Sequence, residues 1–110
     1  SGRRGLGFNY SVREHHTQVE LYIDRGKDSD LENKAIFEQL LAKKSEVEGL
    51  FGEELEWQRL DARRACRIRK VIDIGGYRDP ERWATIHEAA ADAMARFEKA
   101  ARPAISALRI

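Results

Sequence analysis

The stretch GLGFNYSVREHHTQVELYID, from Gly5 to Asp24, decides the fold of this chain. Apolar residues alternate with polar ones on both sides of a short charged centre, and a period of two residues is typical of β-strands. A four-residue connection at Glu14–Thr17 would put both apolar sets on the same face of a hairpin. The cross-strand pairs predicted by this connection are Val12 with Val19, Tyr10 with Leu21, and Phe8 with Ile23.

The chain repeats this order of segments. Gly5–Asp24 is followed by a helical pattern over Ser29–Phe51, and Leu55–Ile74 is followed by another over Asp79–Leu108. Two hairpins that each lead into a helix predict an α+β fold of the order ββαββα, in which two helices cover one face of a four-stranded antiparallel sheet. The second hairpin, connected at Asp61–Arg64, has these predicted pairs: Trp57 with Ile68, Glu56 with Arg69, and Gln58 with Arg67.

The first helix has recognisable ends. Ser29 and Glu32 have the spacing of a capping box, in which each side chain bonds the backbone amide of the other residue. Gly52 suits the left-handed residue that often ends a helix. Between these ends, apolar residues recur at helical spacing and predict one buried stripe. Its members are Ile36, Phe37, Leu40, Leu41, Val47, Leu50 and Phe51.

The second helix starts after a pair of glycines. Asp79 and Pro80 have the chemistry of an N-cap and a first helical residue. Pro103 lacks a backbone donor and clashes with the preceding turn, so we expect the helix to kink or end there and Ala104–Ile110 to form a separate turn or tail. The core residues expected from both helices are Phe37, Leu40, Phe51, Trp83, Ile86 and Phe97.

The composition, with 42% hydrophobic and 35% charged residues, is typical of one soluble globular domain. No apolar run approaches the roughly 18 residues that cross a bilayer, so we expect no membrane contact. The lone Cys66 cannot form an internal disulfide and no signal peptide precedes the first strand, which favours the cytoplasm. The chain opens at Ser1 without a methionine. We therefore expect residues 1–110 to be a single accessory domain, a C-terminal fragment of a larger protein whose N-terminal domains are its missing partners.

Patterns that suggest an enzyme are weak. The tripeptide Glu32–Lys34 spells the end of a restriction-type nuclease motif, but that motif belongs on a strand and here it falls in a predicted helix. His15 and His16 are adjacent, and adjacent side chains do not converge on a metal. Cys66 is predicted to point inward as a small apolar residue. We therefore expect no catalytic residue, no metal and no cofactor, and we do not expect the chain itself to be an enzyme.

Basic residues concentrate in the second predicted hairpin. From Arg59 to Lys70 there are five arginines and one lysine against Asp61 alone, whereas Leu31–Glu56 has seven glutamates against three lysines. Guanidinium groups suit phosphate oxygens, and an aromatic ring on the same face could stack on a base. The candidate contacts with a polyanion or a partner are Arg63, Arg64, Arg67, Arg69 and Tyr22.

Three interpretations of this basic face remain open. It could contact nucleic acid, it could contact a protein, or Glu20 and Glu56 could neutralise it within the fold. Protein contact is the first hypothesis, so the predicted function is a non-catalytic interaction module. The alternative is a nucleic-acid-binding domain that uses the arginine-rich second hairpin. The sequence leaves the oligomeric state open.

Several segments carry a family resemblance. They are GLGFNYSV, VELYIDRG, ENKAIFEQL, FGEELEWQRLD, CRIR and RDPERW. Together they resemble the bacterial domain of unknown function 4268 family, typically a C-terminal module of longer proteins, over nearly the whole chain. Similar modules follow nuclease-like or modification-dependent restriction domains, so the resemblance implies a role in nucleic-acid-directed defence, with either DNA or a nuclease domain of the parent protein as the partner. The family brings no established catalytic residues, so the resemblance implies context rather than chemistry.

Overall fold

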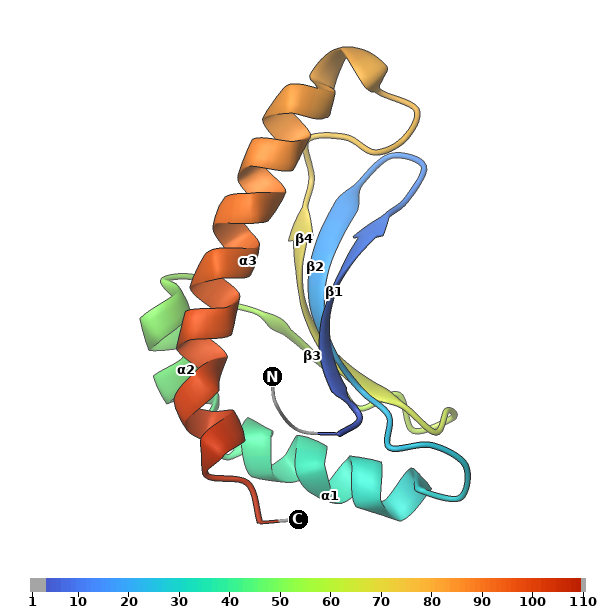
Figure 1. The fold of residues 1–110 in the computed structure, drawn as a ribbon, viewed down its shortest axis with the longest axis vertical. Coiled ribbons are helices and arrows are strands. Elements are labelled where there is room, and N and C mark those ends of the chain that lie inside the picture. Colours follow the sequence, from blue (N-terminus) through green and yellow to red (C-terminus); the bar gives the residue numbers. More distant parts are fainter. Residues whose placement is uncertain (1–3, 110) are drawn as a thin grey trace.

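The computed structural model describes residues 4–109 as one antiparallel sheet with helices packed against it (Figure 1). The sheet order is β1-β2-β4-β3. The elements in chain order are β1 (Leu6–Val12), β2 (Thr17–Ile23), α1 (Asp30–Leu41), α2 (Lys44–Phe51), β3 (Glu56–Gln58), β4 (Cys66–Ile72), a 3₁₀ turn η1 (Pro80–Arg82) and α3 (Trp83–Ser106). The predicted α+β class and the four-stranded antiparallel sheet are confirmed. No helix within residues 4–109 combines the length and the apolar character that a membrane span requires.

The hairpin of β1 and β2 differs from its predicted register by two residues, so the three predicted pairs are wrong. The connection is Arg13–His16, and the Arg13 amide donates to the His16 carbonyl at 2.8 Å. A shift of two residues keeps every side chain on its own face, which is why the alternation could not distinguish the two registers. The observed pairs are Leu6 with Ile23, Phe8 with Leu21, Tyr10 with Val19, and Val12 with Thr17.

The register of β3 and β4 is confirmed. The pairs are Glu56 with Arg69, Trp57 with Ile68, and Gln58 with Arg67. The connection is longer than predicted, however, and runs from Arg59 to Ala65 instead of Asp61–Arg64. Its carbonyls bond the ammonium group of Lys34 instead of a neighbouring strand, so β3 stops after three residues.

The first predicted helix is two helices. α1 ends at Leu41 and α2 begins at Lys44. The Lys43 amide donates to the Leu40 carbonyl three residues back, at 2.9 Å, and such a tight bond closes the last turn of a helix. The break lets α1 cross one end of the sheet while α2 packs against α3, two directions that one straight helix cannot take (Figure 1). Gly52 ends α2 at φ 94°, in the left-handed conformation that was predicted.

The predicted capping box does not form. The Ser29 hydroxyl donates to the Gly26 carbonyl, and the Glu32 carboxylate pairs with Arg25. The Ser29 carbonyl still accepts the Asn33 amide at 2.8 Å, as the residue before a helix does. Both side chains therefore hold the loop before α1, where the capping pattern had placed them on the helix end.

The third helix continues through Pro103 to Ser106, so the prediction of a stop or a separate tail at Pro103 is wrong. Proline has no N–H group to donate to the carbonyl of Lys99, four residues before it. Both residues are exposed, so water can hydrate this carbonyl instead. Ala104 and Ile105 are buried and hold the last turn on the core.

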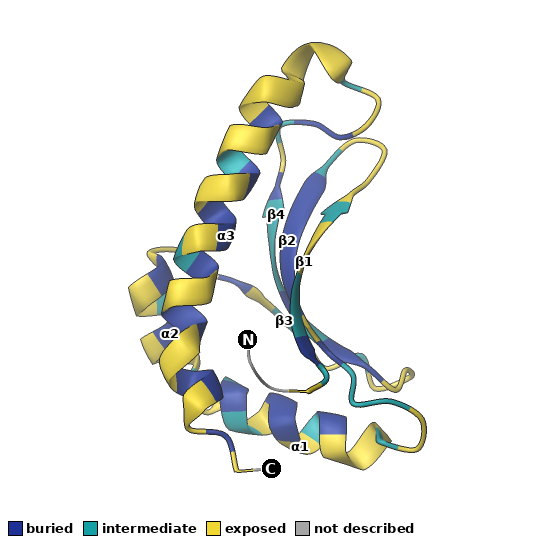
Figure 2. Cartoon of the chain, viewed as in Figure 1, coloured by how far each residue is buried: buried dark blue, intermediate teal, exposed yellow. Residues whose placement is uncertain are grey.

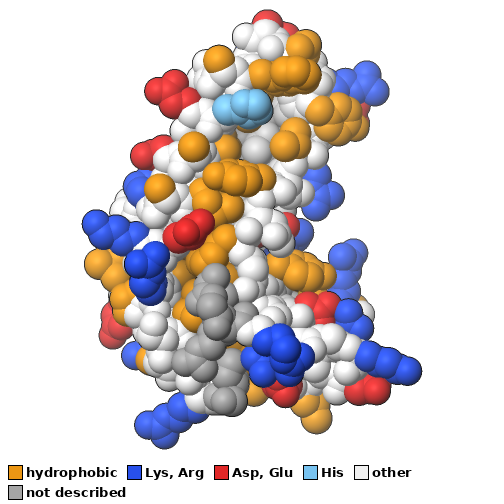
Figure 3. All heavy atoms as spheres, viewed as in Figure 1, with side chains coloured by type: hydrophobic (Ala, Val, Ile, Leu, Met, Phe, Trp, Pro, Cys, Tyr) orange, Lys and Arg blue, Asp and Glu red, His pale blue; other side chains and the backbone are white. Residues whose placement is uncertain are grey.

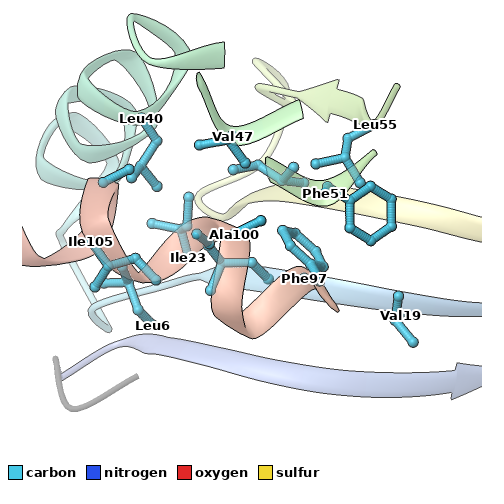
Figure 4. Packing of buried hydrophobic residues seen from close by; sticks show 14 of the residues in the cluster. Leu6, Val19, Ile23, Leu40, Val47, Phe51, Leu55, Phe97, Ala100 and Ile105 are labelled. Atoms are coloured by element: carbon cyan, nitrogen blue, oxygen red, sulfur yellow. The ribbon is translucent and has the colours of Figure 1, made fainter. Parts of the chain in front are cut away.

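The core fills the space between the sheet and the three helices (Figure 4). The Phe97 ring lies 5.3 Å from the Phe8 ring and 5.8 Å from the Phe51 ring, between centroids. Two predictions are wrong: Trp83 is 49% exposed and Leu50 is 63% exposed. Figure 2 shows the reason for Trp83, since the first turns of α3 extend past the sheet and are mostly exposed. The predicted core residues that are buried are Phe37, Leu40, Phe51, Ile86 and Phe97.

Candidate interaction surface

The structure divides the predicted arginine cluster between two places. Arg63 and Arg64 lie in the exposed loop between β3 and β4. Arg67 and Arg69 lie on β4 and face away from the helices, because their neighbours Cys66 and Ile68 are buried in the core. On this outer face of the sheet, Tyr22 is the cross-strand partner of Arg67 and is 38% exposed.

The two arginines on β4 belong to a network of paired side chains, the outer-face network. Its members are Gln18, Glu20, Glu56, Gln58, Arg67 and Arg69. Arg69 donates to the Glu56 carboxylate at 3.1 Å and to the Gln18 amide oxygen at 2.7 Å. Arg67 lies 3.9 Å from the Glu20 carboxylate, and burial, aided by the charge of Arg69, lowers the pKa of Arg67. A phosphate would have to compete with carboxylates that already hold both guanidinium groups.

The loop arginines differ from each other. Arg64 donates to the Asp24 carboxylate at 2.7 Å, and this bond, aided by the Gly26 amide, lowers the pKa of Asp24 despite its partial burial. Arg63 is exposed and has no carboxylate partner within residues 4–109. Of the four predicted contact arginines, three are therefore neutralised by acidic side chains of this same domain.

Lys34 holds the loop that carries these two arginines. Its ammonium group lies within hydrogen-bond distance of four loop carbonyls, which share its three N–H donors: those of Arg59 at 2.7 Å, Arg63 at 2.8 Å, Leu60 at 3.0 Å and Ala65 at 3.3 Å. The neighbouring Asn33 is fully buried, donates to the Arg64 carbonyl at 3.2 Å and accepts the Arg25 amide at 2.9 Å. The nuclease-like tripeptide Glu32–Lys34 thus ties α1 to two loops through all three of its side chains.

The other reactive residue types are used structurally or exposed. Cys66 is buried as predicted, its thiol lies 3.8 Å from the Asn33 carbonyl, and burial raises the pKa of the thiol. His15 is exposed on the hairpin turn beside Glu14. In the part of the chain that the structure describes, no group of three or more His, Cys, Asp or Glu side chains is placed to hold a metal.

A half-open apolar cavity of about 550 Å³ lies between the tip of the β1–β2 hairpin and the start of α3. Four large side chains on its wall are about half exposed: Tyr10 at 55%, Val12 at 52%, Tyr77 at 54% and Trp83 at 49%. We call these four residues the apolar cluster. Figure 3 shows hydrophobic side chains gathered over this end of the molecule, next to a histidine. Large apolar groups exposed together are typical of a surface that another molecule covers.

Backbone contacts fix the wall of this cavity. Gly76 packs so closely on the hairpin turn that a Cβ atom there would lie 2.0 Å from the Arg13 carbonyl oxygen. The same oxygen accepts the Tyr77 amide at 2.9 Å. The Thr17 hydroxyl donates to the Gly75 carbonyl at 3.1 Å. Tyr77 is therefore held beside the tip of the hairpin, and the cavity exists before any partner arrives.

The strand β1 forms one edge of the sheet. The bond from Arg13 to His16 continues the β1–β2 ladder, in which hydrogen-bonded pairs alternate with non-bonded ones, so the odd-numbered residues of β1 aim their backbone groups at β2. The even-numbered residues aim theirs outward. We call the N–H and C=O groups of Phe8, Tyr10 and Val12 the free edge, because no residue within 4–109 bonds them.

This edge lacks the protection that edge strands usually have. Leu6–Val12 contains no charged residue, no proline and no break in its pairing with β2. The opposite edge, β3, has three residues and includes the charged Glu56. The free edge and the apolar cluster meet at Tyr10 and Val12, which belong to both. The sequence predicted Tyr10 as a cross-strand core neighbour and did not single out Tyr77, because an alternating pattern does not show where the covering helix departs.

The comparisons with known proteins give one match. The family model described as Domain of unknown function (DUF4268) matches residues 1–105, which confirms the resemblance found in the sequence. No curated protein and no solved structure matches the chain significantly.

Proposed function

Because this chain belongs to the domain of unknown function 4268 family, whose description states no activity, we propose its function from geometry: it is a non-catalytic interaction module of a larger protein. It binds protein at the apolar cluster and the free edge. The larger protein acts in nucleic-acid-directed defence in the bacterial cytoplasm, the context that the family resemblance implies.

One observation carries the proposal. Four large apolar side chains, each about half exposed, surround a preformed cavity beside an uncharged strand edge with open hydrogen-bonding groups. When apolar side chains of a partner enter such a cavity, they leave water, and binding is stabilised by about 25 cal/mol for each Å² of apolar surface that becomes buried. An added strand satisfies the open backbone groups, and this is a common mode of peptide recognition. The partner that fits is an extended, uncharged protein segment with apolar side chains.

The nucleic-acid alternative has less support. Arg64, Arg67 and Arg69 each have a carboxylate within 4 Å. Binding of random duplex DNA, followed by fluorescence anisotropy, should therefore be absent near 50 mM salt, roughly where non-specific contacts are strongest. Binding that weakens steeply as salt is raised would restore the alternative.

Site-specific photocrosslinking tests the proposal directly. A photoreactive phenylalanine analogue replaces Tyr77 in the natural protein within its own cells, and the control places the analogue at Leu31, which is 88% exposed on α1 at the other end of the molecule. We expect protein adducts at position 77, identified by mass spectrometry, and none at position 31. No adduct at position 77, or the same adducts at both positions, would contradict the proposal.

A further inference from the structure

We infer that the segment which covers the free edge is β1 of a second copy of this chain, so that two copies pair antiparallel and join their sheets. The inference rests on the proposed function and names its partner. It follows from the chemistry of the free edge, which is complementary to itself.

The outward groups set the register of this pairing. Hydrogen-bonded pairs form between residues whose N–H and C=O groups both point across the interface, so even-numbered residues must face even-numbered ones. When Tyr10 lies on the twofold axis, it faces Tyr10 of the second copy, and Phe8 faces Val12 of the second copy. Every group of the free edge then exchanges a bond, and the pairing does not need Leu6, which lies at the buried start of the strand.

The same register brings Tyr10 and Val12 of the two copies together. Side chains of even-numbered β1 residues face the helices, so Tyr10 and Val12 of both copies meet on one side of the joined sheet. Their exposures of 55% and 52% fall as each covers the other across the axis. A twofold interface uses the same patch on both subunits, and the uncharged side chains of Tyr10 and Val12 meet that condition because they do not repel their own copies.

Charge does not oppose the pairing. On the outer face of the joined sheet, Asn9 faces Ser11 of the second copy, and Arg13 faces Gly7 of the second copy. Like charges directly opposite each other would destabilise such a pair, and this register contains none. The net charge of the chain is only +1, so two copies repel each other weakly.

Two double variants of the full chain test both the partner and the register. Asn9→Lys/Ser11→Lys puts two lysines opposite each other twice across the interface, whereas Asn9→Lys/Ser11→Glu puts a lysine opposite a glutamate twice. Both variants change the same two outer-face positions, so they have the same effect on core packing. Circular dichroism and thermal unfolding verify that each variant is folded.

Sedimentation velocity at protein concentrations up to about 1 mM, the range of weak specific association, gives the result. We expect a dimer for the natural chain, a monomer for the double lysine variant, and a dimer for the lysine and glutamate variant. A natural chain that stays monomeric overturns the inference, as does a dimer that survives the double lysine variant. Loss of the dimer in both variants overturns the register. A crosslink from position 77 to a different protein, with a monomeric natural chain, overturns this inference while it supports the proposed function.

Discussion

Replacing Lys34 with methionine tests whether a single side chain holds the loop Arg59–Ala65. Methionine retains most of the apolar stem of lysine but has no donor. Four loop carbonyls, at 2.7, 2.8, 3.0 and 3.3 Å from the ammonium group, would lose the three N–H donors that they share. One of these residues, Leu60, has φ 54°, a conformation that leucine rarely adopts.

The magnitude follows from the exposure of these bonds. The bonds to Arg59 and Arg63 are exposed, so water can replace the ammonium group there, whereas those to Leu60 and Ala65 are partly buried. A hydrogen bond to a charged group contributes at least about 1.5 kcal/mol, so the two partly buried bonds together contribute about 3 kcal/mol. That is a large fraction of the roughly 5–15 kcal/mol that stabilises a typical domain.

Urea unfolding followed by circular dichroism measures this loss. The matched control is Lys99→Met, the same chemical change at an exposed position on α3, which should alter the free energy of unfolding by less than about 0.5 kcal/mol. Amide exchange in residues 59–65 should accelerate in Lys34→Met at urea concentrations where the domain remains folded. A loss for Lys34→Met no larger than for Lys99→Met would refute the reasoning.

Further predictions concern the core, the hairpin turn and acid stability. Gly76→Ala forces a Cβ atom to within 2.0 Å of a backbone oxygen and should lower the thermal midpoint sharply. Its control, Gly49→Ala, meets nothing within 4 Å and should raise the midpoint, because alanine has a helix propensity about 1 kcal/mol better than glycine. Equal midpoints for the two variants would contradict this. Phe97→Ala should cost about 3–5 kcal/mol in urea unfolding and the half-exposed Trp83→Ala about 2 kcal/mol, and the reverse order would show that the core is misplaced. The hydrogen bond from Arg64 lowers the pKa of Asp24 below the value in the unfolded chain. The ionised Asp24 carboxylate therefore stabilises the fold above a pH of about 4, and this stabilisation is lost as the pH falls further. Asp24→Asn should remove this part of the pH dependence of unfolding, and parallel curves for the variant and the natural chain would exclude it.

Local patterns predicted most of the architecture. Alternation identified the strands, helical spacing identified the helical segments, and Gly52 ended α2 as its lack of a side chain suggests. The register of β3 and β4 followed because it places Trp57 and Ile68 together on the helix-facing side.

The remaining features depend on contacts between distant segments. The predicted register of β1 and β2 was wrong because two registers bury the same face and differ only in the position of the turn. The Tyr77 amide, from a distant segment, helps to hold the turn that is observed. The loop after β3 depends on Lys34, 25 residues before Arg59, and no local pattern links the two.

The candidate site shows the same limit. Arginines along the turn and one strand of the second hairpin suggested a binding face, but their partners include Glu20 on β2 and Asp24 just after it. The apolar cluster was missed because alternation predicts that every apolar residue on the inner face of a strand is buried, as it would be if a helix covered the whole strand. At Tyr10 and Val12, α3 no longer covers the sheet completely. How far a helix extends over each strand is determined by the assembled fold.

Amide hydrogen exchange, followed by nuclear magnetic resonance at about 20 µM and about 1 mM protein, tests most directly whether the free edge mediates association. The account predicts that the amides of Phe8, Tyr10 and Val12 exchange rapidly in dilute solution and become protected at the higher concentration. The amides of Asn9 and Ser11, which face β2, should be protected at both concentrations. Absence of any concentration-dependent protection at the three outward amides, or the same gain at the inward ones, would contradict the account.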